Sequence, residues 1–180
     1  MRTARFVSRS FVIHPSRMSN DMQIDLTDGL AAGVFRAGLK SGVISFGPIV
    51  QWADRRITEE AAPAEWLIEL SLASPDRIND VVALLRPASE GVANEAVANA
   101  GLALVDLPAD RSVASARRLL SVMHPFVQHA EANALLRQLS EWGDALTASD
   151  AESAAEVFAF AAARQNPSIR AFFQPVVWDA

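Results

Sequence analysis

Prolines divide the middle of the chain, residues 42–87, into three short stretches that each carry apolar side chains at regular spacing. Pro48 lies near the start of the first stretch, Pro63 opens the second, and Ser74-Pro75 opens the third. Proline is tolerated in the first turn of a helix but not in its interior, because it has no amide hydrogen to donate. The spacing therefore predicts three consecutive helices with defined ends.

The first stretch has the clearest pattern of a helix with one buried face. Ser45 is the expected N-cap, since its hydroxyl can accept a hydrogen bond from a free amide of the first turn. Asp54 and Arg55 fall on the face opposite the apolar stripe, and Trp52 falls at its edge. The stripe follows the i, i+3, i+4, i+7, i+11 rule and consists of Phe46, Ile49, Val50, Ala53 and Ile57.

The second stretch is apolar nearly all round, apart from a polar strip of Glu65 and Glu69. A helix of this kind is normally buried between neighbours, so we expect it to lie at the centre of the fold.

Other helices are expected over about 27–41, 89–107, 110–125, 126–142 and 150–166. Gly101 either ends the helix over 89–107 or lies within it. The apolar tail from Phe172 to Trp178 is expected to be extended. These expectations predict an all-α fold, a single compact multi-helix bundle or short α-solenoid with extended N- and C-terminal segments.

Residues 1–22 differ from the rest of the chain. They contain four arginines and four serines, and no acidic residue precedes Asp21. The pattern has the composition of a transit peptide, and it also fits an extended basic arm or codons upstream of a true start at Met18 or Met22. We expect residues 23–180 to form a single helical domain.

Composition narrows the classes of function. Apolar residues make up 51% of the 180 residues and charged residues 21%, as in a globular protein. The net charge of −5 argues against nucleic acid as a partner, because phosphate binding needs clustered basic side chains. The chain has no cysteine, which excludes disulfides and thiol catalysis and fits a cytoplasmic location. No apolar run reaches the ~18–20 residues of a membrane span, and no cofactor motif is present, so neither a membrane nor a cofactor is expected.

Two groups of side chains are candidates for chemistry. His124 and His129 lie close together with Glu131, but five residues place two side chains about 140° apart on a continuous helix, unless Pro125 re-aims them. A third metal ligand at recognisable spacing is missing. Glu65 and Glu69 share one helix face, where paired carboxylates either do acid–base work or form a solvated strip. Either group could serve a small metal-dependent or acid/base hydrolase.

The segment 42–72, with Trp52-Ala53-Asp54 followed by Pro63 and Leu67-Ile68-Glu69-Leu70-Ser71, resembles a segment of uncharacterised bacterial helical proteins. Some small acidic helical proteins of this kind are similar to immunity proteins of bacterial toxin systems. The resemblance implies a bacterial helical protein and brings no catalytic residue with it.

Two hypotheses of function follow. The favoured one is a non-enzymatic protein–protein interaction module, of the immunity type in its narrowest form, whose partner contacts include Trp52, Asp54, Arg55 and Trp178. The alternative is the hydrolase that uses His124, His129 and Glu131 or the pair Glu65 and Glu69. Negative charge and exposed aromatic side chains favour the first.

Overall fold

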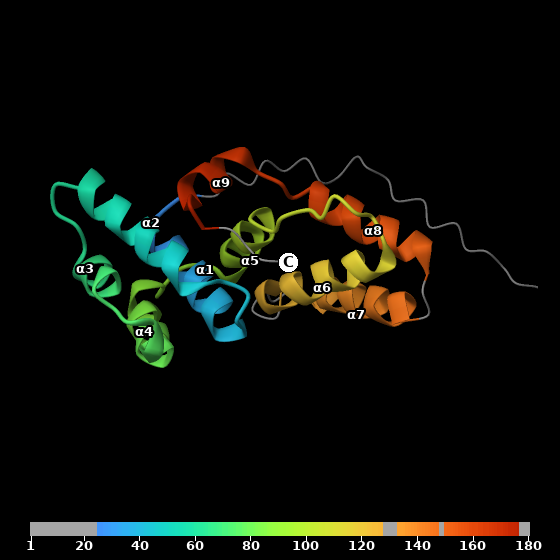
Figure 1. The fold of residues 1–180 in the computed structure, drawn as a ribbon, viewed down its shortest axis with the longest axis horizontal. Helices are drawn as coiled ribbons and strands as arrows, with labels where there is room; N and C mark the ends of the chain where they lie inside the picture. Colours follow the sequence, from blue (N-terminus) through green and yellow to red (C-terminus); the bar gives the residue numbers. More distant parts are fainter. Residues whose placement is uncertain (1–24, 128–132, 148–149, 177–180) are drawn as a thin grey trace, which may run out of the picture.

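The structure is a computed structural model, and it describes residues 25–127, 133–147 and 150–176. These residues form α-helices and one short 3₁₀ turn, without a β-strand, which confirms the all-α class (Figure 1). The elements are α1 (Asp28–Ser41), α2 (Phe46–Glu59), α3 (Glu65–Ser71), η2 (Pro75–Arg77), α4 (Ile78–Ala88), α5 (Asn94–Ala103), α6 (Val113–Val127), α7 (Asn133–Thr147), α8 (Ala151–Ala162) and α9 (Pro167–Phe173).

Helix α1 lies inside the molecule and contacts α4, α5 and α6. Helices α2 and α3 pack on each other at one end, α6, α7 and α8 pack together at the other, and α5 lies between them (Figure 1). The buried apolar side chains form one continuous cluster to which all nine of these helices contribute. The described residues therefore form a multi-helix bundle with a single core.

Helix α1 begins and ends where the sequence predicts. The Thr27 hydroxyl accepts a hydrogen bond from the Leu30 amide at 3.2 Å, and so caps the first turn. Gly42 follows the last turn with a φ of 73°, the left-handed conformation that glycine adopts without strain. The helix buries nine residues between these ends, in accord with its central place.

Trp52 is the centre of an aromatic cluster that joins four helices. Its ring lies 4.9 Å from that of Phe35 on α1, 6.4 Å from that of Trp66 on α3 and 5.8 Å from that of Phe172 on α9, between ring centroids. The expectation that Trp52 lies at an exposed edge is therefore wrong, because its side chain is 0% exposed. Ser45 does occupy the N-cap position of α2, but its hydroxyl makes no capping hydrogen bond to that helix.

Helix α3 is not central, contrary to the expectation from its apolar sequence. Leu67 and Leu70 are fully buried, whereas Ile68 is 43% exposed and the adjoining Leu72 is 82% exposed. The helix packs on α2 and α4 at one end of the molecule, so only one of its faces meets the core (Figure 1).

The C-terminal part of the chain differs from the expectation at two places. Pro125 neither ends α6 nor separates it from a helix at Phe126, because α6 continues to Val127. Phe172 and Phe173, expected in an extended tail, form the last turn of α9, which Asn166 caps by accepting hydrogen bonds from the amides of Ser168 and Ile169. Trp178 lies outside the described residues.

Two aspartates that precede helices, Asp110 before α6 and Asp150 before α8, have lowered pKa values. Hydrogen bonds from the hydroxyls of Ser115 and Ser112 lower the pKa of Asp110, and those from the Ser153 hydroxyl and the Glu152 amide lower the pKa of Asp150. The helix N-terminus also favours a negative charge at such positions. The ionised form of each carboxyl is therefore stabilised by folding.

These shifts predict a specific acid sensitivity. A lowered pKa in the folded state means that the unfolded chain binds more protons below about pH 4, so the stabilisation is present at neutral pH and is lost as the pH falls. We expect the double variant Asp110→Asn, Asp150→Asn to be less stable than the parent at pH 7 and to approach it at pH 3. Urea unfolding at both pH values measures this, and an unchanged difference would contradict it.

Candidate functional site

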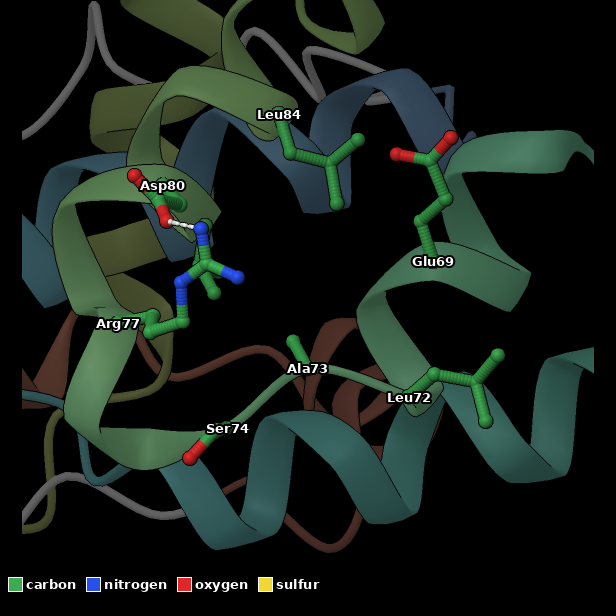
Figure 2. A pocket seen from close by; sticks show the side chains of 8 residues that line it. Glu69, Leu72, Ala73, Ser74, Arg77, Asp80 and Leu84 are labelled. Atoms are coloured by element: carbon green, nitrogen blue, oxygen red, sulfur yellow. Dashed lines mark ion pairs between the residues drawn. The ribbon is translucent and has the colours of Figure 1, made fainter.

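A groove on the surface of α3, η2 and α4 is the main candidate for a binding site. It has a volume of about 320 Å³, and we call it the α3–α4 groove (Figure 2). Its walls are the end of α3, the loop after it, and the first two turns of α4. The residues that line it are Glu69, Leu72, Ala73, Ser74, Arg77, Asp80, Val81 and Leu84.

The local sequence explains why a groove forms here. Helix α3 has seven residues and ends at Ser71, and Ser74-Pro75 then opens the next turn, with the Ser74 hydroxyl 3.5 Å from the Asp76 amide. The early stop separates α3 from α4 by a bend rather than by a continuous helix. Leu72 and Ala73 lie in that bend, between the two helices (Figure 2).

Exposed apolar side chains occur on the two helices that form the groove and in the bend between them, and one of them, Leu72, lines the groove. The large hydrophobic side chains that are exposed in the described residues are Ile68 at 43%, Leu72 at 82% and Ile78 at 40%. All three fall within eleven positions of the chain, although the described ranges cover most of it. Single exposed apolar residues are ordinary, but several in one place mark a surface that another molecule covers.

The rim of the groove is acidic. Arg77 and Asp80 form an ion pair at 2.5 Å between Nη2 and Oδ2, with both side chains largely exposed (Figure 2). Glu69 lines the groove on the α3 side, and within the described residues neither it nor Glu65 takes part in an ion pair (Figure 2). Asp76 is likewise exposed and without an ion pair to a described residue. Residues 65–85 thus carry four carboxylates and one guanidinium, a formal charge of −3.

The predicted partner residues are not brought together on one exposed face. Trp52 is buried and donates from Nε1 to the backbone oxygen of Phe172 at 2.8 Å. Arg55 is half-buried and donates to the same oxygen at 2.5 Å, while exposed Asp54 accepts a hydrogen bond from Ser71. Trp52 and Arg55 therefore hold the end of α9 on α2, which is a structural task.

The catalytic alternative gains no assembled site in the part of the chain that the structure describes. There, no three histidine, aspartate or glutamate side chains lie together as a metal site would require. His124 is exposed in the last turn of α6, while His129 and Glu131 lie outside the described residues. Glu65 and Glu69 are both exposed on α3, and Glu69 lines the groove. The hydrolase stays a prediction, and metal analysis of the purified protein tests its metal-dependent form.

Sequence reasoning missed Ile68, Leu72 and Ile78 as surface residues. The signal was present, because a helix that is apolar on every side fits either a buried position or a surface that a partner covers.

Comparisons of the chain with protein-family models, with curated proteins and with solved structures found no match. In the described ranges, every helix is too short or too polar to cross a bilayer.

Proposed function

We propose that this protein is a non-enzymatic interaction module that binds a partner protein through the α3–α4 groove. The observation that carries the proposal is the exposure of Leu72 in the wall of a groove with an acidic rim, with Ile68 and Ile78 exposed on the helices that form the groove. Leu72 alone leaves four fifths of its side chain in water. Burying such a side chain against a partner stabilises a complex by about 1.5–3 kcal/mol.

The charge of the groove indicates the chemistry of the partner. Glu65, Glu69 and Asp76 have no basic partner among the described residues, so a bound segment can supply one. Complementary charges speed association and select partners more than they add affinity. We therefore infer that the partner presents one or two apolar side chains flanked by lysine or arginine.

The variant Leu72→Asp tests this proposal. It removes the most exposed apolar side chain and puts a carboxylate in its place, which must lose its water when an apolar side chain of the partner covers it. The added negative charge does not repel a basic partner, so weaker binding reports the loss of the apolar contact. We expect the complex to weaken at least tenfold, because a tenfold change corresponds to ~1.4 kcal/mol and burial of the leucine side chain contributes about that much or more. The free energy of unfolding of the free protein should change by less than about 1 kcal/mol.

The measurement has two stages. Proteins captured from the native host by the parent chain are compared with those captured by Leu72→Asp and by a control, Ala159→Asp, which adds the same charge at an exposed position on α8. A captured protein is then purified and titrated against all three chains by calorimetry. Equal binding by the parent and Leu72→Asp, or capture of chaperones alone, would refute the proposal.

The narrowest form of the proposal is an immunity-type inhibitor of a bacterial toxin. The acidic groove and the resemblance of segment 42–72 support it. A toxin encoded beside this protein would be the partner to purify first. Co-expression should then relieve toxicity with the parent chain and with Ala159→Asp, and not with Leu72→Asp.

A further inference from the structure

A second, smaller cavity lies on another part of the surface, where α1 meets the end of α4 and the start of α5. Its volume is about 70 Å³, and we call it the α1–α5 pocket. It shares no residue with the α3–α4 groove. A volume of this size corresponds to roughly two water molecules at ~30 Å³ each, so it admits one small polar group.

Close packing of α1 on α5 shapes the pocket. A Cβ atom on Gly33 would lie 2.8 Å from Cγ2 of Val97, closer than carbon atoms approach. The missing side chain therefore allows the two helices to approach here. Arg36 and Lys40 follow Gly33 at i+3 and i+7 on α1, so the same face of the helix lines the pocket along its length.

The polar side chains of the pocket are hydrogen-bond donors and cations. Arg36 donates from Nη1 to the Ser89 hydroxyl oxygen at 3.0 Å, which holds the guanidinium at the pocket wall. Lys40, the single lysine of the chain, is exposed one turn further along α1. Neither cation forms an ion pair with a carboxylate in the described residues.

The opposite wall of the pocket adds hydrogen-bond donors, and no acidic residue lines it. Asn94 begins α5 and lines the pocket, and the N-cap residue Ala93 has no side chain that could accept a hydrogen bond from the first-turn amides. The backbone amides in the first turn of a helix lack partners within the helix and favour a bound anion. Glu95 follows in the same turn, but it does not line the pocket.

We propose that the α1–α5 pocket binds a phosphate group, free or as the end of a monoester. A phosphate carries nearly two negative charges at neutral pH, which the pair Lys40 and Arg36 matches, and its oxygens accept from several donors at once. The Asn94 side-chain amide adds a further donor at the pocket wall. The Ser89 hydroxyl already donates to the backbone oxygen of Arg86 at 3.0 Å, so its part is to hold Arg36 in place. The remainder of an ester would lie outside, since the pocket holds one small group.

The test titrates the full chain, labelled with ¹⁵N, with sodium phosphate, glycerol 3-phosphate, sodium acetate and sodium chloride at matched ionic strength. We expect saturable shifts of the Asn94 and Lys40 amides with a Kd of order 1 mM, as two charge-assisted contacts of moderate strength would give. Lys40→Gln should weaken binding about tenfold, because it removes one of the two cations that line the pocket. Lys40 is exposed and forms no ion pair in the described residues, so the fold should be unaffected.

Arg86→Gln is the matched control, since Arg86 is an exposed cation on α4 that does not line the pocket. It should bind phosphate as the parent does. Saturation by the ester alone would assign the site to phosphate monoesters, and saturation by both would assign it to the phosphate group itself. Shifts equal to those with chloride, equal weakening by Arg86→Gln, or equally tight binding of acetate would overturn the phosphate assignment.

Discussion

Replacement of Trp52 by alanine is expected to lower the free energy of unfolding by about 4 kcal/mol, as for large aromatic side chains truncated in a core. The indole is 0% exposed and meets rings from three other helices. Alanine would leave a cavity that Phe35, at the centre of α1, cannot fill without moving that helix. Urea unfolding followed by circular dichroism measures the loss.

The same variant should loosen α9 more than the rest of the fold. Trp52 Nε1 and Arg55 Nη2 both donate to the Phe172 oxygen near the end of α9. Trp52→Ala removes one of these donors and leaves Arg55 as the remaining side-chain donor to that oxygen. Faster amide hydrogen exchange in α9 than in α8 would show this local effect.

Trp66→Ala is the matched control for Trp52. Trp66 stacks on Trp52 from α3 but is only half-buried, so we expect a loss of about 2 kcal/mol. If the two variants lower the free energy of unfolding equally, Trp52 is not the residue at which the four helices meet. If both variants lower the free energy of unfolding by less than about 1 kcal/mol, the aromatic cluster around Trp52 is not packed as described.

The sequence predicted helix ends well where one residue determines them. Thr27, Gly42 and Ser74-Pro75 each act on backbone groups within three or four positions. Such local chemistry can be read without knowledge of the fold. The helical character of 42–87 was therefore predictable, and the all-α class followed from it.

Burial was less predictable, because distant residues determine it. Trp52 is buried partly by Phe172, which lies 120 positions later in the chain. Leu72 is exposed because none of the elements that the structure describes packs over the bend between α3 and α4. The two apolar residues have opposite environments, and the periodicity of the segment that contains them does not distinguish one from the other. The candidate groove was missed for this reason.

The packing around Gly101 was also not predictable from the local sequence. Its position near the end of an apolar run fits a left-handed C-cap, but the residue lies inside α5, which continues to Ala103. A Cβ atom there would lie 2.5 Å from Cγ of Phe126 on α6, whose ring is 0% exposed. The glycine is required by the close approach of two helices that the sequence does not show to be neighbours.

Gly101→Ala is therefore expected to destabilise the protein by about 2 kcal/mol, although alanine favours a helix by ~1 kcal/mol over glycine. Gly143→Ala is the matched control, because a Cβ atom on Gly143, also within a helix, meets nothing within 4 Å. That control should gain about 0.5–1 kcal/mol. Thermal unfolding should shift in opposite directions, by roughly 2–4 °C per kcal/mol for a chain of this size.

A double-mutant cycle connects the loss to the ring of Phe126. Phe126→Leu alone should be destabilising, since it removes buried volume next to α5, but the methyl group of Gly101→Ala should then cost less than it does beside the intact ring. A coupling of about 1 kcal/mol or more is expected for side chains in direct contact. Additive effects, or a gain from Gly101→Ala as large as that from Gly143→Ala, would mean that α5 and α6 do not pack at this distance, and the core that supports both surface sites would have to be reassigned.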